Sequence, residues 1–295
     1  MNLTGTGVAL VTPFTPQGDV DFAALDRLVD FVITDQPGQG VEYLVVHGST
    51  GEAATTTAAE KAAILRAVVV RAAGRVPVVV GVGGNDTRTV LAQLAETDLT
   101  GISAVLSVSP AYNKPSQAGI VAHYSAVADA APVPVILYNV PGRTGSNLTA
   151  ATTLELARHP NIIGTKEASG NMSQCLAILA GAPAGFVLTS GEDTLTPALV
   201  AHGAVGVISV QANCYPRRFS AMTRAALAGD FRRATELLFS VLPLDPLLYE
   251  EANPVGVKAA LALRGVCDPM ARLPLLPASE ELTRRIGAVL VPDGA

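Results

Sequence analysis

Eight short apolar segments, each followed by a segment of helical spacing, are the feature that most restricts how this chain can fold. No hairpin turn joins one apolar segment to the next. Strands that alternate with helices in this way pair in parallel, because each connection must cross back over the sheet. The predicted strands are 8–12, 43–46, 77–82, 104–108, 135–139, 162–168, 186–190 and 206–210.

Eight parallel strands can close into a barrel or form an open, doubly wound sheet. A (β/α)₈ TIM barrel needs about 250 residues, and the chain has 295. The open sheet is disfavoured because no strand is followed by a complete Gly-x-Gly-x-x-Gly turn, and Gly81-Val-Gly-Gly84 is only a weak match. We predict a barrel carrying the active site over residues 1–224 and a C-terminal helical extension over 225–295.

Helical spacing is clearest in five segments. Residues 21–34 form the first, with Asp21 as its expected N-cap, and an alanine-rich segment forms the second. The alanine-rich segment is 57–73. Three more segments follow the last strand, separated by prolines, at 232–242, 255–263 and 279–289.

The composition excludes several classes of protein. Hydrophobic residues make up 49% of the chain and charged residues 15%, which is typical of a compact enzyme. The net charge is -5 and no basic run occurs, so nucleic acid and membrane surfaces are not expected partners. The three cysteines are too far apart for a disulfide framework or a Cys-x-x-Cys site. Without an export signal or an apolar run that spans a bilayer, we expect a cytoplasmic protein.

Lys166 is the anomaly in the sixth predicted strand. Ile162 and Ile163 open an apolar run in which an ammonium group is costly unless it has a role. Side chains alternate along a strand, so the neighbouring Glu167 points to the opposite face and cannot neutralise the lysine. Burial would lower the pKa of the amine and make it a nucleophile toward a carbonyl group. The alternative is a lysine that reaches water from the strand end.

Polar residues collect where several predicted strands end, which is the catalytic edge of such barrels. Any single stretch is explained equally well by an ordinary turn, but their joint placement predicts an active site. The stretches are Gly48-Ser-Thr-Gly51, Ser109-Pro-Ala-Tyr-Asn-Lys114, Tyr138-Asn-Val-Pro-Gly-Arg143 and Ser190-Gly-Glu-Asp193.

Three residues of these stretches suit a carboxylate substrate, and a fourth suits proton transfer. Ser49 and Thr50 offer backbone N–H groups and hydroxyls to a small anion, in a turn too short to be a P-loop. Tyr138 could relay protons beside the amine, although a core tyrosine is the alternative. Arg143 is suited to bind a carboxylate, and its alternative is a surface ion pair.

The histidines are assigned no catalytic role. His47 adjoins the Gly48 turn, but no acidic partner is near it in the sequence, and the spacing of the four histidines does not match a metal site. We expect all four to be structural.

Together these motifs resemble the class I aldolase family of dihydrodipicolinate synthase and N-acetylneuraminate lyase. The resemblance extends over nearly the whole chain and keeps the family order. Arg143 favours the synthase branch, because the lyases lack arginine there. The matching stretches are Ala9-Leu-Val-Thr-Pro-Phe14, Gly48-Ser-Thr-Gly-Glu52, Ser109-Pro-Ala-Tyr-Asn-Lys-Pro115, Leu137-Tyr-Asn-Val-Pro-Gly-Arg-Thr-Gly145, Ile163-Gly-Thr-Lys-Glu-Ala168, Ser190-Gly-Glu-Asp193, Gly206-Val-Ile-Ser-Val210 and Asn253-Pro-Val-Gly-Val-Lys258.

The resemblance implies a Schiff-base lyase of lysine and diaminopimelate biosynthesis. Lys166 would bind pyruvate covalently while Ser49 and Thr50 hold its carboxylate. The enamine formed would attack L-aspartate 4-semialdehyde, whose carboxylate meets Arg143, and give 4-hydroxy-tetrahydrodipicolinate. No metal or organic cofactor is implied. The alternatives are another pyruvate aldolase of this family, acting on a sugar acid such as N-acetylneuraminate, and a barrel without catalytic activity.

The remaining roles also follow from the resemblance. Tyr138, Ser49 and Tyr112 would form a proton relay, with Tyr112 supplied by the neighbouring subunit. Ile208 and Gly191 would line the substrate pocket. The resemblance therefore implies a homo-oligomer of at least two subunits, usually a tetramer built from dimers.

The chain departs from its relatives in this family in two respects. Ser49 stands where most synthases of the family have threonine, although the hydroxyl is retained. Members inhibited by lysine carry polar, histidine, glutamate and tyrosine side chains where this chain has Ala53, Ala58, Thr89 and Ala111. We therefore expect L-lysine to inhibit weakly or not at all.

Overall fold

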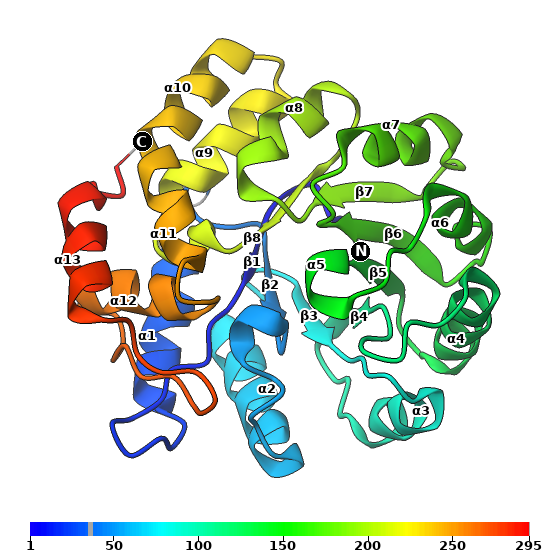
Figure 1. Cartoon of the computed structure of the whole chain (residues 1–295), viewed down its shortest axis with the longest axis horizontal. Coiled ribbons are helices and arrows are strands. Elements are labelled where there is room, and N and C mark those ends of the chain that lie inside the picture. Colours follow the sequence, from blue (N-terminus) through cyan, green and yellow to red (C-terminus); the bar gives the residue numbers. More distant parts are fainter. Residues whose placement is uncertain (35–37, 295) are drawn as a thin grey trace.

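The computed structural model describes residues 1–34 and 38–294 and shows a closed barrel of eight parallel strands inside a ring of helices (Figure 1). The strands follow chain order around the barrel, and β1 pairs with β8 to close it. The predicted TIM barrel is confirmed and the open sheet is excluded. The strands are β1 (Gly5–Ala9), β2 (Tyr43–Val46), β3 (Val78–Gly81), β4 (Ile102–Val108), β5 (Val135–Asn139), β6 (Ile162–Glu167), β7 (Val187–Ser190) and β8 (Gly206–Ser209).

The prediction for the first strand was wrong. It placed the strand at 8–12, whereas β1 begins at Gly5 and ends at Ala9. Gly7, which the predicted strand left out, has a packing role. A Cβ atom at Gly7 would lie 2.1 Å from the ring of Tyr43, so the strand must omit a side chain there to make room for the tyrosine inside the barrel.

Local capping explains where the first two helices begin. The carboxylate of Asp21 accepts a hydrogen bond from the N–H of Ala24 at 2.9 Å, which confirms the predicted N-cap. Thr57 and Glu60 form a capping box at the start of the second helix. The helices of the ring are α1 (Phe22–Ile33), α2 (Ala58–Ala72), α3 (Thr87–Glu96), α4 (Gln117–Ala130), α5 (Pro141–Thr144), α6 (Ala150–Leu156), α7 (Met172–Gly181), α8 (Thr196–Ala201) and α9 (Pro216–Leu227).

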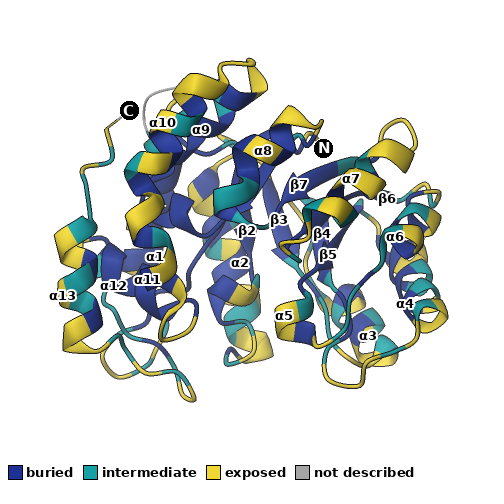
Figure 2. Ribbon diagram, turned by 45° about the horizontal axis from the view of Figure 1, so that its top comes forward, coloured by how far each residue is buried: buried dark blue, intermediate teal, exposed yellow. Residues whose placement is uncertain are grey.

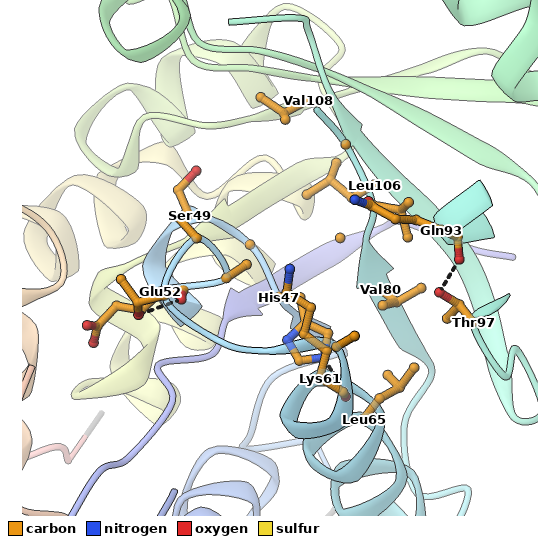
Figure 3. Close-up of a pocket in the computed structure, with 18 of the residues that line it drawn as sticks. His47, Ser49, Glu52, Lys61, Leu65, Val80, Gln93, Thr97, Leu106 and Val108 are labelled. Carbon is orange, nitrogen blue, oxygen red and sulfur yellow. Dashed lines mark hydrogen bonds between the residues drawn. The ribbon is translucent and has the colours of Figure 1, made fainter. Parts of the chain in front are cut away.

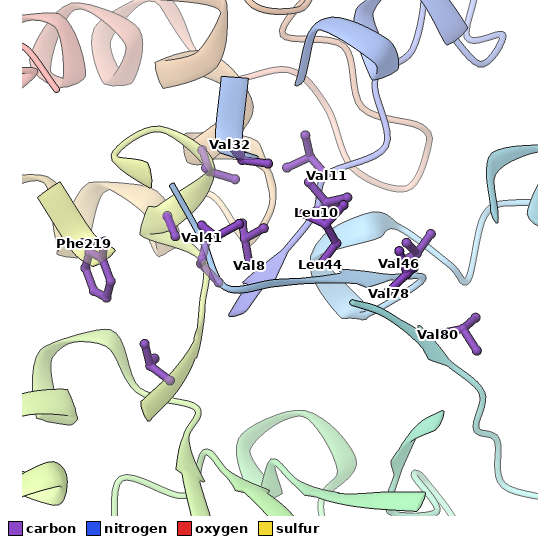
Figure 4. Packing of buried hydrophobic residues seen from close by; sticks show 14 of the residues in the cluster. Val8, Leu10, Val11, Val32, Val41, Leu44, Val46, Val78, Val80 and Phe219 are labelled. Carbon is purple, nitrogen blue, oxygen red and sulfur yellow. The ribbon is translucent and has the colours of Figure 1, made fainter. Parts of the chain in front are cut away.

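Two layers of apolar side chains hold the barrel together. The larger layer lies between the strands and the helices, and Figure 4 shows part of it around Leu44 and Val46. The smaller layer fills the barrel interior. Along β5, Leu137 belongs to the outer layer, whereas Ile136 and Tyr138 belong to the inner one. The alternation of the strand therefore directs the Tyr138 ring into the barrel, as predicted.

The C-terminal extension is helical, as predicted, but contains one helix more. Its helices are α10 (Phe231–Val241), α11 (Asp245–Tyr249), α12 (Val255–Leu263) and α13 (Glu280–Val289), and α12 is largely buried (Figure 2). The prolines had suggested breaks, but Pro246 lies in the first turn of α11, where a missing N–H costs little. The domain boundary at residue 224 stays a prediction and falls within α9.

None of the described helices combines the length and the apolar character that crossing a membrane requires.

Candidate active site

Lys166 and Tyr138 lie side by side inside the barrel. They are paired in register across β5 and β6, and Lys166 Nζ lies 4.5 Å from the centre of the Tyr138 ring. Only 5% of Lys166 and 7% of Tyr138 are exposed. The predicted burial of Lys166 is confirmed, and the alternative of a lysine that extends into water is excluded.

Glu167 faces away from Lys166 and is occupied by other groups. Its carboxylate accepts hydrogen bonds from the amide of Asn139 at 3.0 and 3.1 Å, from that of Gln174 at 3.0 Å and from the N–H of Ser169 at 2.8 Å. These hydrogen bonds hold the carboxylate of Glu167 on the face of the strand opposite to Lys166. The amine of Lys166 has no carboxylate partner among the described residues, which agrees with the alternation predicted for this strand.

The turn after β2 presents free backbone donors. Ser49–Gly51 forms a short 3₁₀-helix, and neither the N–H of Ser49 nor that of Thr50 has an acceptor in the described part of the chain. Unpaired N–H groups at a helix start attract anions. Ser49 is exposed, whereas Thr50 is buried and accepts a hydrogen bond at 3.0 Å from the amide of Asn253.

A cavity of about 880 Å³ opens beside this turn and reaches the grooves around α2 and α3 (Figure 3). Ser49, Tyr138 and Arg143 line it together, although they come from three different strand–loop units. Arg143 lies in α5 and is exposed to solvent. The structure thus places a hydroxyl, a phenol and a guanidinium group around one space. These are groups suited to proton transfer and to binding carboxylates.

Apart from Tyr112, four other predicted site residues do not line this cavity, and Lys166 is one of them. Thr50 lies behind Ser49 in the same turn, and Ile208 is buried in the interior layer on β8. Gly191 follows β7, and its N–H donates to the carbonyl of Glu167 at 2.7 Å. A Cβ atom at Gly191 would lie 2.4 Å from that of Ala168. A glycine is therefore needed where β6 and β7 approach each other, close to Lys166.

Tyr112 is the predicted residue that the single chain leaves outside the site. Its side chain is 87% exposed and does not line the cavity. Its backbone has a φ of 72°, a conformation that costs energy for residues other than glycine. The N–H of Tyr112 donates to the carbonyl of Thr144 at 3.1 Å, which ties its loop to the helix that carries Arg143.

The histidines have structural partners. His47 is buried beside the cavity, its Nε2 lies 2.9 Å from the carbonyl of Lys61, and burial lowers its pKa to about 4. Its ring is therefore neutral at pH 7. His123, His159 and His202 each contact a nearby protein group. No cluster of metal-ligating side chains is found over residues 1–34 and 38–294.

Sequence reasoning missed two polar residues of this region. Asn253 was quoted in a motif without a role, yet it reaches Thr50 and lines the cavity. Asp193 was quoted only as the last residue of the polar stretch Ser190-Gly-Glu-Asp193. It is buried and accepts hydrogen bonds from the N–H groups of Val210 and Gln211 at 3.1 and 2.7 Å, and burial raises its pKa to about 7. Both contacts join distant parts of the chain, so no local pattern reveals them.

Comparisons with known proteins agree with this geometry. The Dihydrodipicolinate synthetase family matches residues 2–291. The 4-hydroxy-tetrahydrodipicolinate synthase of Cytophaga hutchinsonii is 48% identical, with 96% of this chain and 94% of that protein covered. The chloride-inhibited dihydrodipicolinate synthase of Acinetobacter baumannii, solved in complex with pyruvate, is 37% identical, covers 98% of each chain and has a TM-score of 0.94. A synthase of Cyanidioschyzon merolae with lysine bound is 36% identical, covers 97% of this chain and 96% of that one, and has a TM-score of 0.91. The chain therefore belongs to the dihydrodipicolinate synthetase family.

Proposed function

We propose that this protein is a lyase that condenses pyruvate with L-aspartate 4-semialdehyde to give 4-hydroxy-tetrahydrodipicolinate, in lysine and diaminopimelate biosynthesis. The observation that carries the proposal is the buried amine of Lys166 beside the ring of Tyr138. Tyr138 in turn lines one cavity with Ser49, which belongs to a turn with free N–H groups. Relatives at 48% identity over nearly the full chain are named for this activity.

The first half of the reaction uses Lys166 as a nucleophile. Its amine attacks the keto carbon of pyruvate, and loss of water from the carbinolamine gives a protonated imine. Tyr138 supplies and accepts the protons of these steps, with Ser49 and a neighbour's Tyr112 completing the relay. The N–H groups of Ser49 and Thr50 hold the carboxylate of pyruvate, with Ile208 and Gly191 forming the adjacent walls.

The second half uses the imine as an electron sink. The methyl group of the bound pyruvate loses a proton, which gives an enamine. The enamine forms a carbon–carbon bond to the aldehyde carbon of the semialdehyde, and the aldehyde oxygen takes up a proton to become the hydroxyl group of the product. The guanidinium of Arg143 binds the carboxylate of this second substrate, where a charge-assisted pair gives both affinity and orientation. The amino group of the semialdehyde then attacks the imine carbon, which closes the ring and releases Lys166.

Borohydride trapping tests the assignment of Lys166. Incubation with pyruvate and sodium borohydride should give a stable adduct, and peptide mass spectrometry should place it on Lys166. Lys61→Met provides a control, because Lys61 is another lysine that lines the cavity; in this variant the adduct on Lys166 should persist. An adduct elsewhere, or none, would refute the mechanism.

We also infer that the active unit is a dimer, and that two dimers form a tetramer. The support is Tyr112, which is exposed in one chain, held by a loop of fixed conformation and needed for the relay. Mixing two inactive variants, Tyr112→Phe and Lys166→Ala, tests this. A mixed dimer contains one site with an intact lysine and an intact tyrosine, so activity should return. No recovery after confirmed subunit exchange would place Tyr112 outside the partner's site.

Substrate assays separate this function from the two alternatives. Turnover of pyruvate with the semialdehyde supports the synthase. Retro-aldol cleavage of N-acetylneuraminate or a 2-keto-3-deoxy sugar acid, without synthase turnover, would identify another aldolase of the family. An adduct without turnover of any of these substrates would favour a barrel that has lost catalysis.

The three cysteines support a reducing compartment as the place where the protein works. Cys175, Cys214 and Cys267 are all free and buried, which is usual in the cytoplasm. Fractionation of cells followed by immunodetection would test the cytoplasmic location.

A further inference from the structure

The C-terminal extension contacts the carboxylate-binding turn through one side chain. Asn253 lies between α11 and α12, and its amide N–H donates to Oγ1 of Thr50 at 3.0 Å. The exposed fractions of Asn253 and Thr50 are 7% and 3%, so the bond is shielded from water. Asn253 also lines the cavity next to Ser49. A residue far along the chain is therefore placed beside the group that would hold the substrate carboxylate.

This hydrogen bond fixes the role of the Thr50 hydroxyl. A hydroxyl has one proton to donate and can accept through its oxygen. Because the oxygen accepts from Asn253, the proton must point elsewhere, and it finds no acceptor among the described residues. Threonine is stiff at χ1, so the group cannot easily rotate away. The contact leaves Thr50 with a free O–H donor in addition to its free N–H.

A second contact holds the other end of the turn. Glu52 forms a fully buried ion pair with Lys258 of α12, and the N–H of Arg272 donates to the same carboxylate at 3.0 Å. Lys258 also donates to the carbonyl of Met270 at 2.7 Å. These contacts hold the backbone of the turn, whereas Asn253 is the residue that, among those the structure describes, forms a hydrogen bond with the hydroxyl of Thr50.

We propose that Asn253 is a positioning residue that makes Thr50 a hydrogen-bond donor, and so adapts the site to a keto acid with an ionised carboxylate. The inference rests on the proposed function, because it assigns that carboxylate to the Ser49–Thr50 turn. Asn253 acts through Thr50 and takes no part in the chemical steps. Its loss should weaken binding of pyruvate without affecting the semialdehyde.

A double-mutant cycle between Asn253→Ala and Thr50→Val tests the coupling. Asn253→Ala should raise the KM for pyruvate about tenfold, because Thr50 is then no longer held to donate a hydrogen bond to the charged carboxylate. The KM for the semialdehyde should stay within about twofold. In the Thr50→Val background the same substitution should have little further effect. Two effects that simply multiply would show that Asn253 does not act through Thr50.

Asn253→Asp reverses the hydrogen bond without changing the size of the side chain. A carboxylate can only accept, so it should draw the Thr50 proton away from the substrate and add a like charge near it. The KM for pyruvate should rise more than in Asn253→Ala. If the Asn253→Asp variant formed the Lys166 adduct at the same pyruvate concentration as the wild type, the role of Asn253 would be refuted and the proposed function would stand. If the wild type itself formed no adduct, the proposed function would be refuted as well.

Asn213→Ala is a matched control for general damage to the fold. Asn213 is also a buried asparagine near the barrel, but its amide donates only to the backbone carbonyls of Ala9 and Val210, at 2.8 and 3.0 Å. This variant should lower the midpoint of thermal unfolding and leave the ratio of the two KM values unchanged. The same rise in the KM for pyruvate in Asn213→Ala would assign the effect to loosened structure and refute a specific role for Asn253.

Discussion

Lys258 and Glu52 form a buried ion pair: the exposed fraction of the side chain is 0% for Lys258 and 2% for Glu52. The pair joins α12 of the extension to the turn that follows the second strand. The ammonium group of Lys258 also lies 4.2 Å from the centre of the Phe14 ring, in the segment after β1. Three regions that are distant in the sequence thus meet around one desolvated charge pair.

Breaking this pair should destabilise the fold strongly. Lys258→Met leaves Glu52 buried without its partner, a change that usually costs about 3–5 kcal/mol of unfolding free energy. Denaturation in urea, followed by circular dichroism, measures it. Arg285→Ala serves as the control, because its pair with Glu250 is 40% and 43% exposed and should contribute less than about 1 kcal/mol. Equal losses in the two variants would contradict the assigned burial effect.

Removing the phenol of Tyr138 should slow catalysis and spare binding. Tyr138→Phe keeps the ring against Lys166 but deletes the proton relay, so kcat should fall by about 10²–10⁴-fold with a small change in the KM for pyruvate. Steady-state kinetics measure both. Tyr43→Phe is the matched control, since this interior tyrosine makes only a 3.4 Å contact to the carbonyl of Val207. A comparable loss of kcat in Tyr43→Phe would remove the special role of Tyr138.

Removing the charge of Arg143 should affect the second substrate. Arg143→Ala should raise the KM for the semialdehyde by about tenfold or more, because a charge-assisted pair to a carboxylate is lost. The KM for pyruvate should remain near that of the wild type. Arg158→Ala, which removes another exposed arginine, should change neither constant. Equal increases for both substrates in Arg143→Ala would show that Arg143 does not bind the semialdehyde selectively.

L-Lysine should be a weak inhibitor or none. Ala53 and Ala58 line the cavity with methyl groups, which cannot bind an ammonium group as the side chains of inhibited relatives would. Thr89 and Ala111 complete the set of departures. Initial rates over a lysine series, with isothermal titration calorimetry, provide the measurement. Inhibition at micromolar lysine would contradict the expectation.

Asp193 should make stability depend on pH. Burial raises its pKa from 3.8 to about 7, so the unfolded chain releases the proton first, and the contribution of Asp193 to stability is lost as the pH rises from about 4 to about 7. Asp193→Asn keeps an oxygen for the N–H groups of Val210 and Gln211 but cannot ionise. Relative to the wild type it should gain stability between pH 4 and pH 8, by up to about 4 kcal/mol.

Denaturation of both proteins at several pH values tests this sign. His47 contributes in the opposite direction, because its pKa is lowered to about 4, but it is present in both proteins and cancels from the difference. A constant difference from pH 4 to pH 8 would mean that Asp193 is ionised throughout.

The barrel could be predicted because its signal is local and repeated. Apolar strands and amphipathic helices alternate eight times, and each unit is visible within a short window. β1 was misplaced because the reason for Gly7 lies in Tyr43, on the neighbouring strand. α11 was missed because a proline in the first turn of a short helix has the same local appearance as a break.

The candidate site divides in the same way. Lys166 could be predicted because an ammonium group in an apolar strand is anomalous by itself, and Tyr138 because strand alternation gives its direction. Asn253 could not, since 203 positions separate it from Thr50. The use of Tyr112 depends on a second chain and is still a prediction.

The turn that would bind the carboxylate is synthesised long before the residues that hold it. The last strand is finished at Ser209, yet Asn253, Lys258 and Arg272, which fasten the turn after β2, are made later. The contacts that hold this turn can therefore form only after residues 253–272 have been synthesised, later than every strand of the barrel.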